Sequence, residues 1–221
     1  MMMNIFSIFD PSSSLNFSLN WLSMLLLLCL SPYPYWYPPS RTTILWLKLK
    51  NFIFKEFKTL INHSYSNLIL FISLLIMIFF NNFLGLFPYI FTASSHMTFC
   101  LSLSLTLWLG MMIFNLCNFF NNTMSHLTPQ GTPFLLMPFM VIIESISLII
   151  RPLTLAIRLT ANMIAGHLLM ALLGSSGTSL NNFLMLFLII SQIILLALEI
   201  SVSAIQAYVF SVLSTLYSSE A

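Results

Sequence analysis

The chain has 221 residues, of which 59% are hydrophobic and only 5% are charged, with a formal net charge of +2. A soluble domain carries about 25% charged residues, so this composition excludes a fully wetted surface and indicates an integral membrane protein. The long apolar runs predict helices and not a barrel, whose strands would alternate over about ten residues. We expect one all-α polytopic membrane domain over 1–221, with about five membrane-embedded helices.

The N-terminal part predicts one span and one amphipathic helix. An apolar run predicts a first span over 15–30, followed by a segment rich in proline and aromatic residues that suits the membrane interface. Over 43–62, apolar residues recur at helical spacing while lysines and asparagines collect on the other side. This pattern predicts an interfacial amphipathic helix lying on the membrane, with a charged loop as the alternative.

The remaining spans follow from length and hydropathy. We expect spans over 67–90 and 97–120, and then two long segments over 134–173 and 180–217. Forty residues make a helix of roughly 60 Å, against a hydrocarbon core of roughly 30 Å. A turn in the middle of the first segment would need several loop residues, and 150–153 offers only one breaker, Pro152, so we predict one long tilted helix with a local kink, and not two spans joined by a turn. The two long segments form a strongly tilted C-terminal hairpin.

Polar residues in this hairpin carry the functional hypothesis. Glu144, Arg151 and Arg158 are spaced by seven and share one stripe, which Asn162 extends by one turn, whereas His167 faces nearly the opposite way. The second long segment has a similar stripe with Glu199 and Gln206. In an antiparallel hairpin, facing residues have numbers with the same mean, and three polar pairs average 182 or 183: Arg158 with Gln206, His167 with Glu199, and Glu144 with Glu220.

Ionised groups at membrane depth are costly, so their default interpretation is functional. Carboxyl and imidazole groups can take up and release protons, whereas a guanidinium stays charged. Arg158 therefore cannot relay protons, but it can act as a fixed electrostatic gate. The alternatives are structural: Glu144 and Glu199 as protonated carboxyls bonded to a neighbour, His167, Asn162 and Gln206 as helix-packing residues, and Arg151 as a snorkelling anchor.

Other classes of membrane protein fit less well. A self-contained channel or secondary transporter predicts internal repeats or broken half-helices, and the sequence has no internal symmetry. The four histidines do not supply paired haem ligands, and HExxH and paired aspartates are absent, which disfavours a redox subunit and a protease. The cysteines stand singly, as packing residues. We expect no cofactor, no metal and no nucleic-acid partner.

Four motifs are distinctive. They are Asn82-Phe83-Leu84-Gly85-Leu86-Phe87-Pro88-Tyr89-Ile90-Phe91-Thr92, His126-Leu127-Thr128-Pro129-Gln130-Gly131-Thr132-Pro133, Arg158-Leu159-Thr160-Ala161-Asn162-Met163-Ile164-Ala165-Gly166-His167-Leu168-Leu169, and Ile205-Gln206-Ala207-Tyr208-Val209-Phe210. With these motifs the chain resembles one known family, subunit a of the F-type ATP synthase, in its mitochondrially encoded, insect-like form. The resemblance extends over essentially the whole chain.

The resemblance implies a proton-translocating stator subunit, not catalytic for ATP chemistry by itself. Its partners would be a rotor ring of small proteolipid subunits, other membrane-sector and peripheral-stalk subunits, the lipid bilayer and protons. Arg158 matches the arginine that faces the rotor carboxylates and prevents a short circuit. Glu199 and His167 match one half-channel, open to the intermembrane space, and Glu144 and Glu220 match the other, leading to the matrix. Gln206 and Asn162 match polar residues near the arginine, and Arg151 receives no role.

The resemblance and the charge distribution also imply a location. Five of the seven Lys and Arg residues lie between Arg41 and Lys58, so this part is expected on the matrix side. We therefore expect a multi-pass protein of the mitochondrial inner membrane, with its N-terminus towards the intermembrane space and its C-terminus towards the matrix.

Overall fold

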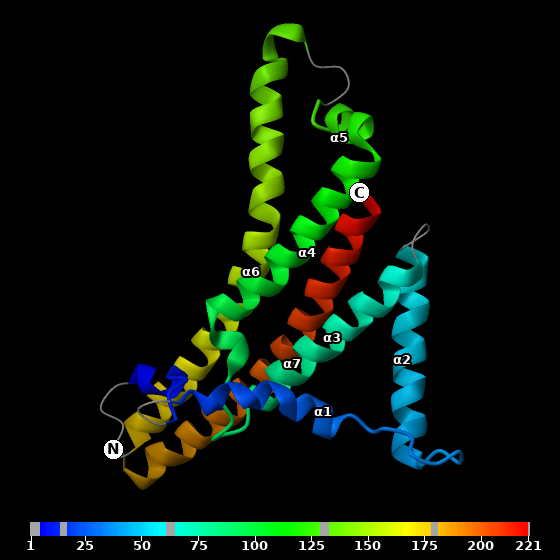
Figure 1. Ribbon diagram of the computed structural model, residues 1–221. Coiled ribbons are helices and arrows are strands. Elements are labelled where there is room, and N and C mark those ends of the chain that lie inside the picture. Colours follow the sequence, from blue (N-terminus) through cyan, green and yellow to red (C-terminus); the bar gives the residue numbers. More distant parts are fainter. Residues whose placement is uncertain (1–4, 14–16, 61–64, 129–132, 178–180, 221) are drawn as a thin grey trace.

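The computed structural model describes residues 5–13, 17–60, 65–128, 133–177 and 181–220, and all regular structure in these ranges is helical (Figure 1). The all-α prediction is thereby confirmed. In chain order the helices, with 3₁₀ helices marked η, are η1 (Ile5–Phe9), η2 (Leu19–Leu25), α1 (Leu26–Leu30), α2 (Arg41–Leu60), α3 (Tyr65–Gly85), η3 (Ala93–Ser95), α4 (Met97–Asn118), α5 (Phe120–His126), η4 (Phe134–Leu136), α6 (Met137–Ser176) and α7 (Asn182–Glu220).

Four helices in the described ranges are long and apolar enough to cross a membrane, namely α3, α4, α6 and α7. Their ends lie within a few residues of the predicted spans. The largest difference is at α3, which ends at Gly85 and not at residue 90. Pro88 explains this, because a proline ring within a helix would collide with the carbonyl of Leu84. The chain instead turns, with Tyr89 in the left-handed region at φ 73°.

The predicted first span over 15–30 is shorter than expected. Of this range, η2 and α1 cover Leu19–Leu30, twelve residues that rise about 20 Å and fall short of a core of about 30 Å. Ser23 Oγ donates a 3.0 Å hydrogen bond to the carbonyl of Phe91 in the α3–α4 connection. This apolar segment therefore runs across one end of the bundle as a fifth, shorter helix (Figure 1).

The amphipathic helix predicted over 43–62 is α2. Its apolar face packs on α3, where Phe57 is fully buried together with Leu68 and Phe71. The ring of Trp46, near the start of α2, lies 5.5 Å from that of Phe80, near the end of α3, so the two helices are antiparallel. The opposite face is exposed and basic, with Lys48, Lys55 and Lys58. Helix packing alone does not fix α2 relative to a bilayer surface, so its interfacial position stays a prediction.

The long C-terminal hairpin is present, and α6 continues through Pro152 without a loop. The prediction of one long helix in place of two short spans is therefore confirmed. Figure 1 shows α6 changing direction near its middle, where proline removes an amide donor and favours a kink. At 40 and 39 residues, α6 and α7 are each about 60 Å long.

The two arms of the hairpin are held chiefly by other helices. α7 packs most extensively on α3, and α6 on α4. Apart from Phe210, the buried face of α7 is made of small residues, which allow close helix approach, and the serine and threonine hydroxyls among them donate to carbonyls of their own helix. These residues are Ser203, Ala207, Ser211, Ser214 and Thr215. The apolar core where α3, α4, α6 and α7 meet consists of Ile78, Cys100, Leu155, Ala156, Leu159, Ala207 and Phe210.

Candidate functional site

Core packing sets the direction in which Arg158 points. Leu155, Leu159 and Met163, at helical spacing, are buried on one face of α6. Arg158 therefore falls on the other face and is exposed, as are Ala161, Asn162 and Ala165, which continue the same stripe. No hydrogen bond or ring contact joins Arg158 to another residue in the described part of the chain. A permanent cation thus stands on an open helix face that is otherwise lined with small side chains.

A cavity of about 230 Å³ lies next to this face, between α6 and α7. Its wall is mostly apolar but includes the polar side chains of Asn162, His167 and Glu199. Leu86, the first residue after α3, also lines it. Nε2 of His167 and Oε1 of Glu199 are both buried, and neither has a hydrogen-bond partner among the described residues. Buried polar atoms normally find partners, so a cavity of this size with these polar atoms in its wall suits water beside them.

Glu199 reaches this cavity because the facing position on α6 is glycine. A Cβ added to Gly166 would stand 2.6 Å from Oε1 of Glu199 and 2.9 Å from its Cδ, closer than van der Waals contact allows. Any larger residue at 166 would therefore push the carboxyl group away. The glycine therefore makes room for the carboxyl group of Glu199 on α7.

The predicted register of the hairpin is confirmed by its contacts. Among the pairs of residues that face each other across the hairpin are Arg151 with Tyr217, whose side chains meet, and three glycines that each point the position of a Cβ at a side chain of α7: Gly166 at Glu199, Gly174 at Gln192, and Gly177 at Leu188. In each, the two residue numbers average between 182 and 184. The pairing of His167 with Glu199 follows this register, and both line the same cavity.

Other predicted site residues lie farther away. Glu144 is half-buried in the first third of α6, about 21 Å before Arg158 along the axis and on the far side of the proline bend. Gln206 is half-buried on α7. Among the described residues, no hydrogen bond or ring contact joins it to Arg158, so that pair stays a prediction. Glu220 closes α7, but its side chain lies outside the described part.

Two neighbours of the site were not predicted. The ring of Phe9 in η1 meets that of His167 edge to face, with centroids 6.4 Å apart. Leu86 reaches the cavity from a turn distant in sequence. Neither residue carries a chemical signal in the sequence, because both are ordinary apolar side chains. Gly166, in contrast, could have been found from the sequence. Glycine within a helix costs stability, so its presence there indicates that another group comes close to the helix backbone.

The arrangement separates titratable groups from a fixed charge. His167 and Glu199 lie on the turn side of Arg158, and Glu144 lies on the other, so no continuous chain of titratable groups passes it on α6. Asn162 belongs both to the cavity wall and to the exposed face of Arg158. It therefore links the cavity with the open surface. Within the described ranges, no group of three or more His, Cys, Asp and Glu residues could hold a metal ion.

Known proteins resemble the chain over its whole length. A family model described as ATP synthase A chain matches residues 2–219. ATP synthase subunit a of Drosophila melanogaster is 58% identical over 222 residues, which cover 100% of this chain and 99% of the relative. The namesakes from Locusta migratoria and Anopheles gambiae are each 57% identical, with the same coverage. The chain therefore belongs to the ATP synthase A chain family.

Proposed function

We propose that this chain is the proton-translocating stator subunit of the membrane sector of an F-type ATP synthase. It works beside a rotating ring of small proteolipid subunits, each with a membrane carboxylate, and it performs no ATP chemistry by itself. We place it in the mitochondrial inner membrane, with its N-terminus towards the intermembrane space and its C-terminus towards the matrix. The relatives named ATP synthase subunit a support the complex, and their insect sources support the organelle.

The observation that carries the proposal is the exposed face of α6. An arginine on an open, apolar helix face needs an acidic partner, because an ionised group in lipid costs at least a few kcal/mol. Ala161 and Ala165 beside it allow another helix to approach closely. A rotor helix that presents a carboxylate meets both requirements. The peripheral-stalk subunits would then contact other faces of the chain.

Proton uptake would use the cavity beside that face. A proton from the intermembrane space would reach His167 and Glu199, which line the cavity, and pass Asn162 to a rotor carboxylate. Neutralised, the carboxylate could leave the arginine and travel through lipid with the ring. Release to the matrix would occur after nearly a full turn, on the side of Glu144 and Glu220.

Arg158 would keep these two routes apart. Because a guanidinium stays protonated, it cannot pass a proton on, and its positive field repels a proton that approaches from either side. One proton that crosses the membrane releases roughly 2.3 kcal/mol per 100 mV, so a leak past the arginine would lose energy that rotation must collect. A separated pair of half-channels therefore couples proton flow to the motion of the ring.

The test removes the charge at Arg158 and compares the effect on ATP synthesis with that of removing an arginine at a different position. In vesicles with reconstituted complexes at equal subunit content, we expect Arg158→Ala to abolish proton-driven ATP synthesis. Arg41→Ala, which removes the same group from an exposed position at the start of α2, should leave synthesis close to the wild-type rate. Normal synthesis in Arg158→Ala would contradict the proposal. Proton conduction by the wild-type chain without a ring would favour a self-contained channel instead.

A further inference from the structure

The proline bend is a mechanical weak point in the helix that carries Arg158. Pro152 has no amide hydrogen, and its ring displaces the carbonyl one turn earlier, so the hydrogen bonds of α6 do not hold the two halves at a fixed angle. Arg158 lies six residues later, about 9 Å along the axis. A change of 10° at the bend would move its backbone by about 1.5 Å. Contacts to other helices must therefore fix that angle.

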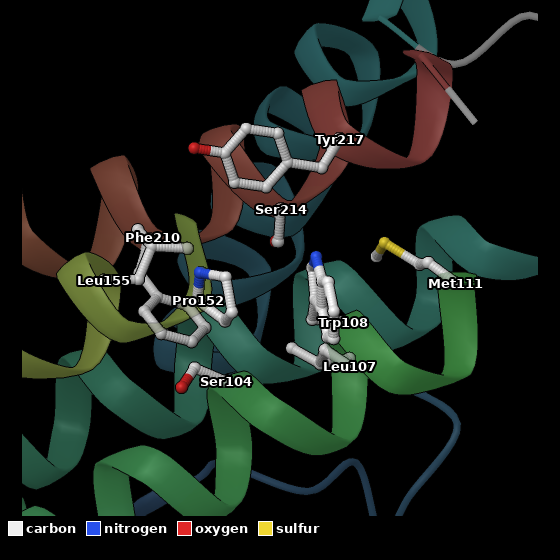
Figure 2. A pocket seen from close by; sticks show the side chains of 9 residues that line it. All are labelled: Ser104, Leu107, Trp108, Met111, Pro152, Leu155, Phe210, Ser214 and Tyr217. Carbon is white, nitrogen blue, oxygen red and sulfur yellow. The ribbon is translucent and has the colours of Figure 1, made fainter. Parts of the chain in front are cut away.

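Packing around Pro152 is incomplete. A cavity of about 20 Å³ lies between α4, α6 and α7, and Figure 2 shows the side chains around it. Pro152 and Leu155 line it from α6, Ser104 and Trp108 from α4, and Tyr217 is among the residues that α7 contributes. The gap has room for about one water molecule, so part of the surface around the bend lacks the side-chain contacts that a filled core would give it.

A contact between Arg151 and Tyr217 ties α6 to α7 at this point. The guanidinium carbon of Arg151, directly before the proline, lies 5.1 Å from the ring centroid of Tyr217. This is within the distance at which a guanidinium and an aromatic face attract each other, and the attraction grows where water is excluded. Arg151 is half-buried, and so is Tyr217 in the last turns of α7. Arginine suits the contact because its flat group stacks on a ring.

We propose that Arg151 is a positioning residue for Arg158. Stacked on Tyr217, it fixes the angle of α6 at Pro152 and thereby the place at which Arg158 meets the rotor. The two arginines are seven residues apart and lie on nearly the same side of the helix, so movement at one is carried to the other. This inference rests on the proposed function of Arg158. It assigns Arg151 a role in positioning, whereas the alternative interpretation treats Arg151 only as a charged anchor at the membrane surface.

The experiment separates stacking from charge. Tyr217→Leu removes the ring and keeps both arginines, whereas Tyr217→Phe keeps the ring and serves as the matched control. Arg151→Gln removes the cation, and the double variant Arg151→Gln with Tyr217→Leu tests whether the two side chains act together. The readout is the coupling ratio, the rate of ATP synthesis divided by proton flux, in reconstituted complexes of equal content. Poor folding lowers the amount of complex, but it does not lower this ratio.

We expect the coupling ratio to fall about threefold to tenfold in Tyr217→Leu and in Arg151→Gln, with the double variant no worse than either, and to stay at the wild-type value in Tyr217→Phe. A wild-type ratio in Tyr217→Leu would overturn the inference, and so would additive losses in the double variant. Arg158→Ala in the same assay keeps the two proposals distinct. If Arg158→Ala fails while Tyr217→Leu is normal, only the positioning role is wrong; if Arg158→Ala is normal, the proposed function is wrong.

Discussion

Gly166→Ala tests the geometry of the cavity with the smallest possible change. The new methyl group would stand 2.6 Å from Oε1 of Glu199, so the carboxylate must retreat by about 0.8 Å to regain ordinary contact. A side chain forced about 30° from its rotamer costs about 1 kcal/mol, and replacing glycine by alanine in a helix returns about 0.5–1 kcal/mol. Stability should therefore hardly change, while the carboxylate is displaced.

The functional loss should be much larger than the change in stability. A misplacement of about 1 Å in a reacting group can cost up to about a hundredfold in rate, and we expect about a tenfold slower proton-driven ATP synthesis in Gly166→Ala. The matched control is Gly110→Ala on α4, where an added Cβ meets nothing within 4 Å. Both variants would be measured in vesicles at equal complex content. Equal rates in the two variants would refute the close approach of Glu199 to α6.

Three further predictions follow from contacts of the described residues. Glu199→Gln keeps the size of the side chain but cannot hold a proton for transfer, so proton flux in reconstituted vesicles should fall at least tenfold; unchanged flux would remove its role. Gly85→Ala would place a methyl group 2.9 Å from Cγ2 of the buried Thr92, and should lower the free energy of unfolding by about 2 kcal/mol, seen as a lower Tm than that of the Gly110→Ala control. Trp21→Leu removes a ring 5.1 Å from that of His96, and should speed hydrogen exchange in η2 while α6 stays protected; equal exchange in η2 would show that the ring does not anchor it.

Sequence patterns predicted the long hairpin and its register because both depend on periodicity. Residues spaced by seven on α6 and α7 fix which faces meet, and one proline is not enough to break a 40-residue apolar helix. The exposed position of Arg158 was also within reach, since it is offset from the buried Leu155 and Leu159 by helical spacing alone. Helical periodicity is enough to predict which residues share a face of a helix.

Features that depend on tertiary packing were not predictable in the same way. The apolar run up to Leu30 has the composition of a span, but the length of its helix depends on how it packs beside Phe91 and His96. The function of Gly166 depends on which side chain stands opposite, and the stacking of Arg151 on Tyr217 depends on the angle at the proline. A sequence gives the residue types for these contacts but not their distances.

The central claim is that two separate water-accessible routes reach opposite sides of the membrane. Labelling with a membrane-impermeant thiol reagent tests it directly, in complexes where the exposed Cys29 and Cys117 are replaced by serine. We predict that the Glu199→Cys variant is labelled from the intermembrane-space side only, and the Glu144→Cys variant from the matrix side only. Labelling of both variants from the same side, or of either from both sides, would contradict the account.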